Sequence, residues 1–184
     1  MPEHERAMLP LWLDILLTIA VTLVFAALLR IFVAEMFIVP TGSMLDTIQL
    51  QDHILGEKLT IRFGSAKRGD IVTFNDPDGS GVILVKRVIA LGGQTVELVD
   101  GVVYVDGVAL DEPYTQGKRS DPIVPSMYGE PLSYPYYVPE GYVWLMGDNR
   151  IDSLDSRYFG AVSLSELTSR AVCVVWPFSN ARFF

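Results

Sequence analysis

Cysteine and histidine are scarce in this sequence, which limits the chemistry it can carry. Cys173 is the single cysteine among 184 residues, so an intrachain disulfide and a cysteine-based metal site are excluded. The two histidines, His4 and His53, are too few and too far apart in sequence for a histidine metal cluster. We therefore expect no metal and no cofactor. Cys173 lies in an apolar run and is interpreted as a buried packing thiol.

Basic residues are also few. Lysine and arginine number 14 against 22 aspartates and glutamates, which gives a formal net charge of -8 at pH 7. Nucleic-acid binding needs clustered lysine and arginine, so nucleic acid is excluded as a partner. An acidic chain can still be a membrane protein, because an inserted helix needs no basic surface.

One long apolar run, residues 11–29, indicates a membrane segment. Its 19 residues would span about 28 Å as a helix, close to the thickness of the hydrocarbon core. Asp14 is its only charge, and Trp12 is placed where an interfacial aromatic would lie. A cleaved signal peptide has a shorter apolar core and a small-residue cleavage site, and a buried soluble helix has a polar face. We predict a short tail over residues 1–10 and an uncleaved transmembrane anchor over residues 11–33, in contact with the lipid bilayer.

The rest of the chain has the pattern of a β domain over residues 34–184. Short β-branched runs bounded by Gly, Pro and Asp predict strands. These runs are residues 53–61, 70–74, 82–91, 95–99, 102–105, 142–146 and 170–176. We expect an all-β domain preceded by one N-terminal transmembrane helix.

Turn signals separate several of these strands. Asp100-Gly101 suits a type I′ hairpin turn, whose two central residues need positive φ, and Asp106-Gly107 predicts a second tight turn. Residues 111–141 are rich in Pro, Tyr, Ser and Gly and are expected to form a surface excursion. Residues 164–167 are expected to form one helical turn, capped by Ser163 or Ser165.

Lys86 is a charged residue inside the apolar run 82–91. Side chains alternate along a strand, so Lys86 and Arg87 face opposite sides and one of them points toward the core. Burial lowers the pKa of a lysine, and a neutral lysine can accept a proton from a nearby hydroxyl. Taken alone, the strand leaves open a lysine that reaches the surface or pairs with an acid.

Ser43 lies in a turn that follows an apolar strip, residues 36–39. Serine in such a turn usually makes only local hydrogen bonds. Gly42, however, lets the backbone approach a substrate closely. Taken alone, this turn leaves both a local role and a catalytic role open.

A third motif makes the combination specific. The polar stretch Gly147-Asp-Asn-Arg-Ile-Asp-Ser-Leu-Asp-Ser-Arg157 lies between two expected strands. Together with Pro40-Thr-Gly-Ser-Met44 and Val85-Lys-Arg-Val-Ile89, it resembles the type I signal peptidases, bacterial membrane serine proteases with a Ser–Lys dyad. The resemblance covers about residues 8 to 178.

The resemblance implies a role for each motif residue. Ser43 would be the nucleophile that forms an acyl-enzyme, and Lys86 would be the general base. The Thr41 hydroxyl and the Ser43 N–H would hold the oxyanion, and Ser153 would hydrogen-bond Lys86 and orient it. Two ion pairs would brace the third motif: Arg87 with Asp148, and Asp155 with Arg157.

The resemblance also implies the substrate and the location. A preprotein with a signal peptide would lie extended along Phe37–Val39 and Leu84–Lys86 and add a strand by main-chain bonds. Apolar walls formed by Val39, Met44 and Val85 would admit only small side chains, as in Ala-X-Ala cleavage sites. The fold implied is the antiparallel β domain shared with self-cleaving Ser-Lys repressors. The catalytic domain would lie outside the bacterial cytoplasmic membrane, held by a single pass and serving protein secretion.

One departure and three alternatives accompany this resemblance. Asp46 stands where the family usually has proline, followed by Thr47. His53 could serve as the base, as in eukaryotic relatives, although Lys86 occupies the place of that residue. The chain could also be a non-catalytic membrane-anchored β module that binds exported chains, or a peptidase of the same family dedicated to one substrate.

Overall fold

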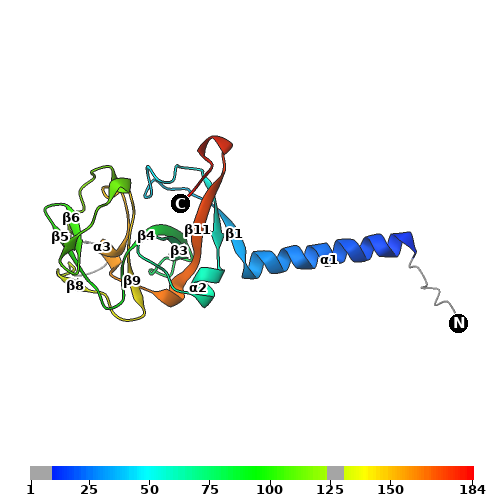
Figure 1. Ribbon diagram of the computed structural model, residues 1–184, viewed down its shortest axis with the longest axis horizontal. Coiled ribbons are helices and arrows are strands. Elements are labelled where there is room, and N and C mark those ends of the chain that lie inside the picture. The colour runs from blue at the N-terminus through cyan, green and yellow to red at the C-terminus, as the bar shows by residue number, and fades with distance from the viewer. Residues whose placement is uncertain (1–9, 124–130) are drawn as a thin grey trace.

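A long N-terminal helix projects from a β domain in the computed structural model, which describes residues 10–123 and 131–184 (Figure 1). Helix α1 (Leu11–Phe32) has 22 residues, none of them buried. It is the one helix in the described ranges that is long and apolar enough to cross a membrane. It covers almost the span expected for the anchor, whereas the expected tail lies outside the described residues except for Pro10.

The domain after α1 is a β domain, as the sequence predicts, and its described residues form two antiparallel sheets. The larger sheet has the order β1-β2-β11-β3-β4-β9-β10, with β12 paired to β11, and the smaller sheet has the order β7-β6-β5-β8. The larger sheet contains β1 (Ala34–Ile38), β2 (His53–Glu57), β3 (Ile71–Asn75), β4 (Ile83–Leu91), β9 (Tyr142–Met146), β10 (Val162–Ser163), β11 (Leu167–Trp176) and β12 (Arg182–Phe183). The smaller sheet contains β5 (Thr95–Val99), β6 (Val102–Val105), β7 (Val108–Ala109) and β8 (Tyr136–Tyr137).

Both predicted tight turns are confirmed. Asp100 and Gly101, between β5 and β6, have φ of 52° and 85°. Asp106 and Gly107, between β6 and β7, have φ of 54° and 76°. Positive φ at both central residues is what a type I′ turn requires. These local signals therefore determine how the smaller sheet folds back on itself.

Helices other than α1 are short. They are α2 (Leu59–Phe63), η1 (Pro113–Thr115), α3 (Ser156–Phe159), η2 (Leu164–Glu166) and η3 (Phe178–Asn180). The predicted helical turn at residues 164–167 is confirmed as η2. The Ser163 hydroxyl caps it by accepting the N–H of Ser165 at 3.2 Å.

Two predictions about the β domain need correction. The strand expected over residues 53–61 ends at Glu57, because the Glu57 carboxylate accepts the N–H of Thr60 at 3.0 Å and the chain turns into α2. The excursion expected over residues 111–141 is not confined to the surface. Ser120 is 1% exposed and Val138 is fully buried.

A hydrophobic cluster lies beneath the serine motif and the lysine strand. Its buried members come from β2, β3, β11 and the chain after β1, and they are Val39, Met44, Ile48, Ile54, Ile71, Ala171 and Val174. Phe37 and Val85 pack at its edge. Burying one such aliphatic side chain contributes roughly 1.5–3 kcal/mol, so this cluster fixes both motifs to one rigid support. Cys173 is buried, as the sequence predicts.

Candidate active site

The structure brings Ser43 and Lys86 into direct contact. The Nζ atom of Lys86 lies 2.6 Å from the Oγ atom of Ser43 and also donates to the Val85 carbonyl oxygen at 3.1 Å. Lys86 lies on β4 and is 2% exposed, and Ser43 lies in the turn after β1 and is 9% exposed. Arg87 lies on the opposite face of the strand, so the lysine is the member of the pair that points inward.

The third motif holds the serine turn in place. The backbone N–H of Asn149 donates to the Ser43 carbonyl oxygen at 3.0 Å, and its side-chain Nδ2 donates to the Gly42 carbonyl oxygen at 2.9 Å. Gly147 approaches so closely that a Cβ atom there would collide with the Ser43 carbonyl oxygen and the Ser153 hydroxyl. Glycine at this position is therefore a requirement of packing.

Burial gives Lys86 the charge behaviour of a base. Desolvation lowers the pKa of Lys86 from 10.5 to about 8, although the charges of Asp155 and Asp148 oppose the shift. The guanidinium of Arg157 lowers this pKa further. A substantial fraction of Lys86 is therefore neutral near pH 8, and a neutral amine can accept the Ser43 proton.

Two ion pairs lie near the lysine. They join the same residues that were expected to pair. Arg87 binds Asp148 through both carboxylate oxygens, at 2.8 Å and 2.6 Å. Arg157 binds Asp155 in the same bidentate way, at 2.9 Å and 3.0 Å. Both carboxylates are fully buried. Breaking either pair would leave an uncompensated buried charge, which costs about 3–5 kcal/mol.

The hydrogen bond expected between Ser153 and Lys86 is not formed in this structure. The Ser153 hydroxyl is buried and has no partner among the described residues. Lys86 instead donates to Ser43 and to the carbonyl oxygen of Val85. Thr41, the expected oxyanion donor, is exposed two residues before Ser43.

The residues expected to contact substrate divide into two groups. Phe37 and Val85 are half-buried at the edge of the cluster. Val39 and Met44 are 3% and 0% exposed, so they can form only the floor of a substrate site. All four belong to the cluster that supports Ser43.

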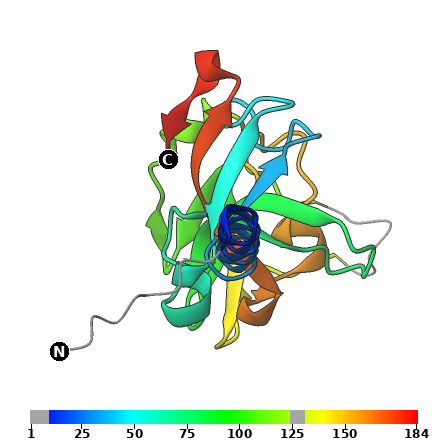
Figure 2. The same ribbon diagram turned by 90° about the vertical axis from the view of Figure 1, so that its right-hand side faces the viewer.

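Among the described residues, part of strand β4 lies beside the serine with one edge unpaired. Residues 83–86 of β4 pair with β3, but the register with β9 begins only at Arg87. Strand β1 is an edge strand of the described larger sheet, at the opposite end from β10. Figure 2 looks along α1 and shows β1 leading away from the helix into this sheet. The main-chain groups of residues 83–86 that point away from β3 are therefore available to an extended peptide.

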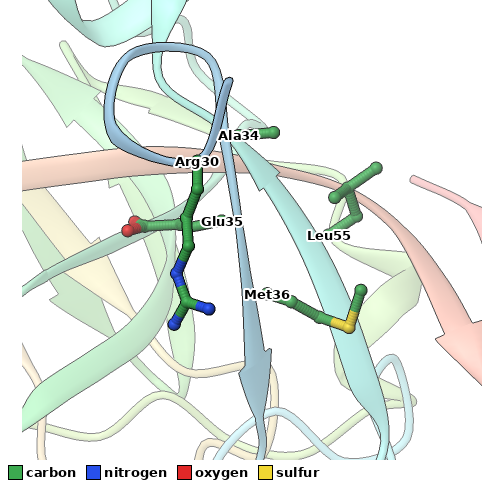
Figure 3. Close-up of a pocket in the computed structure, with 5 residues that line it drawn as sticks. All are labelled: Arg30, Ala34, Glu35, Met36 and Leu55. Atoms are coloured by element: carbon green, nitrogen blue, oxygen red, sulfur yellow. The ribbon is translucent and has the colours of Figure 1, made fainter. Parts of the chain in front are cut away.

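A separate cavity of about 300 Å³ lies where α1 joins β1 (Figure 3). Its lining residues are Arg30, Ala34, Glu35, Met36 and Leu55. None of them belongs to the serine or lysine motif. This cavity is a feature of the anchor junction and lies outside the Ser43–Lys86 pair.

Sequence reasoning missed several residues that support the site. They are Thr47, Glu112, Tyr114, Asn149 and Arg150. Thr47 donates its hydroxyl to Asp148, and Asn149 binds the serine turn. Asn149 and Arg150 lie inside the third motif, so their place in that motif was the available sequence signal. No local signal marks Glu112 or Tyr114.

The site therefore places a serine in hydrogen-bond contact with a buried lysine, on an antiparallel β framework beside an open strand edge. The protein-family model "Signal peptidase, peptidase S26" matches residues 12–176. The chain therefore belongs to the signal peptidase family, peptidase S26, and within it to the signal peptidase I type, whose members are enzymes that remove signal peptides.

Two individual relatives agree with this family. The chain is 38% identical over 167 residues to probable signal peptidase I-1 of Synechocystis sp., which covers 87% of this chain and 80% of that protein. It is 34% identical over 170 residues to signal peptidase I of Leptolyngbya laminosa, which covers 87% and 77% of the two chains. A crystal structure of a signal peptidase I from Enterococcus faecalis is 33% identical with a TM-score of 0.47, and covers 58% of this chain and 96% of that one.

Proposed function

We propose that this chain is a membrane-anchored serine endopeptidase that removes signal peptides from exported preproteins, with Ser43 as nucleophile and Lys86 as general base. The observation that carries the proposal is the 2.6 Å contact between Lys86 Nζ and Ser43 Oγ. Burial keeps the lysine partly neutral near pH 8, because it lowers the pKa. A surface lysine with an ordinary pKa would be charged and could not take the serine proton.

The reaction would proceed through an acyl-enzyme. Neutral Lys86 takes the proton of Ser43 as Oγ attacks the scissile carbonyl carbon, and the carbonyl oxygen becomes an oxyanion. The Ser43 N–H and the Thr41 hydroxyl donate to this oxyanion. The lysine ammonium then returns the proton to the leaving amine, which leaves an ester on Ser43. Lys86 next takes a proton from water, and the resulting hydroxide attacks the ester carbonyl carbon. The C–Oγ bond then breaks, and the lysine ammonium returns its proton to Ser43 Oγ.

The proposed specificity is for small residues, as in Ala-X-Ala sites. The substrate would lie extended along residues 83–86, where the strand edge is open. Met44 and Val39 form a closed floor below Ser43. A floor of buried side chains leaves little depth for a large substrate side chain next to the cleaved bond. Phe37 and Val85 would form the walls.

The proposed location follows from α1. Residues 11–33 would anchor the chain in the bacterial cytoplasmic membrane with a single pass, in contact with lipid. Residues 34–184 would form the catalytic domain on the extracytoplasmic side, where signal peptides emerge. The helix has no buried residue in the described structure, which is consistent with lipid contact along its length.

Preprotein cleavage in detergent by the full chain tests the proposal. Ser43→Ala and Lys86→Ala should each abolish cleavage and leave the circular dichroism spectrum unchanged, because a nucleophile and its base act as a unit. Ser65→Ala and Lys67→Ala are matched controls, because both side chains are exposed. Substantial cleavage by either dyad variant would rule out the assigned pair.

The same assay separates the alternatives. A non-catalytic module would bind preproteins and cleave none of them, in wild type as in the variants. A dedicated peptidase would cleave one preprotein in a panel, whereas a general enzyme would cleave most of them.

A further inference from the structure

Glu112 binds the buried arginine of the third motif. The Arg150 side chain is 0% exposed and that of Glu112 is 9% exposed. Nη1 and Nη2 of Arg150 donate to the two Glu112 carboxylate oxygens at 2.8 Å and 2.7 Å. Nη1 also donates to Ser120, and Nε donates to the Gly147 carbonyl oxygen at 3.0 Å. A buried guanidinium needs an anionic partner, so Glu112 determines where Arg150 lies.

Arg150 in turn connects both parts of the active site. It directly follows Asn149, whose N–H donates to the Ser43 carbonyl oxygen at 3.0 Å. The Arg150 carbonyl oxygen accepts Nη2 of Arg157 at 2.7 Å, and Arg157 lowers the pKa of Lys86. A displacement of Arg150 would therefore disturb the support of the nucleophile and the electrostatic surroundings of the base together.

Tyr114 extends the same contact to the second ion pair. Its hydroxyl donates to Glu112 Oε1 at 2.8 Å, and the Arg87 guanidinium lies 4.0 Å from its ring centroid. This distance is within the range of a cation–π contact. Burial, together with the charge of Glu112, raises the pKa of the Tyr114 phenol, so the phenol stays protonated and keeps donating. Arg87 is the partner of Asp148, so Glu112 and Tyr114 together brace both ion pairs.

A second contact between residues 112–120 and the serine turn is much weaker than the Glu112–Arg150 pair. Lys118 lies 3.3 Å from Asp46, three residues after Ser43, but the two side chains are 22% and 48% exposed. Solvent and salt screen such a surface pair. The buried Glu112–Arg150 pair is therefore the connection that matters.

We propose that Glu112 is a positioning residue of the active site. Through Arg150 and Tyr114 it holds the third motif against the serine turn, so that Ser43 and Lys86 remain in hydrogen-bond contact. The inference rests on the proposed function, because it presupposes that this pair is catalytic. The described side-chain hydrogen bonds of Glu112 go to Tyr114 and Arg150 and to none of the proposed substrate-binding residues, so we expect its loss to act on the chemical step rather than on substrate binding.

The test compares Glu112→Gln and Glu112→Ala with Asp111→Asn and Asp111→Ala in the full chain. Asp111 is the exposed acidic neighbour, so its variants remove the same charge one position away. Preprotein cleavage is measured in detergent, and kcat is expressed per folded enzyme. Misplacing reacting groups by about 1 Å can cost about 100-fold in rate. We expect Glu112→Ala to lose about 10- to 100-fold in kcat with KM nearly unchanged, Glu112→Gln to lose less, and the Asp111 variants to match wild type.

A wild-type kcat in Glu112→Ala, with only a lower melting temperature, would show a purely structural residue and overturn the proposal. If Glu112→Ala does not fold, Tyr114→Phe decides, because it keeps the ring and removes one hydrogen bond to Glu112. A several-fold lower kcat at unchanged KM supports the proposal, and a wild-type kcat overturns it. Ser43→Ala distinguishes a failure of the proposed function from a failure of this inference. An active Ser43→Ala overturns the proposed function as well, whereas an inactive one beside fully active Glu112 variants overturns this inference alone.

Discussion

The carboxylate of Asp155 is the charge that most strongly opposes the lowered pKa of Lys86. Asp155 is fully buried and pairs with Arg157 at 2.9 Å, and Arg157 lowers the same pKa. The pair therefore places a carboxylate near the lysine, while the arginine limits how far that carboxylate raises the lysine pKa. Desolvation dominates, and the pKa settles at about 8. A base with this pKa can work close to neutral pH.

The pH profile of kcat/KM should rise along a limb centred near pH 8. Lys86 must be neutral to take the Ser43 proton, so activity grows as the pH passes upward through the lysine pKa of about 8. A profile measured between pH 5 and 10 with a soluble preprotein would show this. A wild-type profile without a limb above pH 6 would mean that Lys86 is not the titrating base.

Asp46→Pro should leave that limb where it is. The Asp46 side chain is 48% exposed and pairs with Lys118, and it is not among the main charges that act on the lysine pKa. Asp46→Asn is the control that removes the charge without changing the backbone. A limb that moves down by one pH unit or more in both variants would show that Asp46 does couple to Lys86.

Lys86→Met should stabilise the fold at pH 7 while it abolishes cleavage. The pKa of Lys86 is about 8 in the folded chain against 10.5 as the model value, so the folded state binds fewer protons between these pH values. The lysine therefore costs stability below pH 8, and the cost fades as the pH rises toward 10.5. Its full size is about 3 kcal/mol. Thermal melts at pH 7 and pH 10 measure it.

The exposed lysine variant Lys67→Met provides the reference for these melts. We expect little change in its melting temperature at either pH, because the Lys67 side chain is exposed. An equal melting temperature for Lys86→Met and wild type at pH 7 would contradict a desolvated lysine.

Thr41→Val should lower kcat by about 10²–10³-fold and change KM little, by analogy with oxyanion donors in other serine hydrolases. Valine has nearly the shape of threonine but no hydroxyl, so the variant removes one donor to the developing oxyanion. Thr41→Ser keeps the hydroxyl and should retain most of the activity. If KM rises while kcat holds, Thr41 binds substrate and the oxyanion role is wrong.

Gly147→Ala should reduce kcat by at least about 10-fold, because the new methyl group would displace the Ser43 backbone. The added Cβ would collide with the Ser43 carbonyl oxygen and the Ser153 hydroxyl. Gly147→Ala/Ser153→Ala removes the Ser153 hydroxyl but should not restore activity, because the Ser43 carbonyl oxygen and the Ser153 Cβ atom still obstruct the added methyl group. Steady-state kinetics of both variants and of Ser153→Ala alone test this. Full rescue by the double variant would contradict the assigned cause.

Local sequence signals predicted much of the fold. The apolar run gave the helix, and the two Asp-Gly pairs gave the turns of the smaller sheet. The run 53–61 misled because β-branched residues continue past Glu57, whereas the Glu57 carboxylate captures the Thr60 N–H and ends the strand. A side-chain hydrogen bond of this kind competes with strand propensity and leaves no mark on the hydrophobic pattern.

The site was predictable only where motifs carried it. Ser43 and Lys86 were named from their motifs, and the structure places them together, whereas their catalytic roles remain predictions. Glu112 could not be found in this way. Its partner Arg150 lies 38 residues later in the chain, and 22 acidic residues could have supplied the counter-charge. Only the folded backbone selects among them.

The direct junction between α1 and β1 fixes the position of the β domain relative to the helix. Val33 alone separates the helix from the strand, and its carbonyl oxygen accepts the N–H of Lys58 at 2.8 Å, which ties the junction to the chain after β2. The five residues of β1 rise about 17 Å at about 3.3 Å per residue. In the proposed membrane arrangement, Ser43 would therefore lie at a fixed distance from the bilayer, and it would reach only those bonds that leave the membrane at a matching distance.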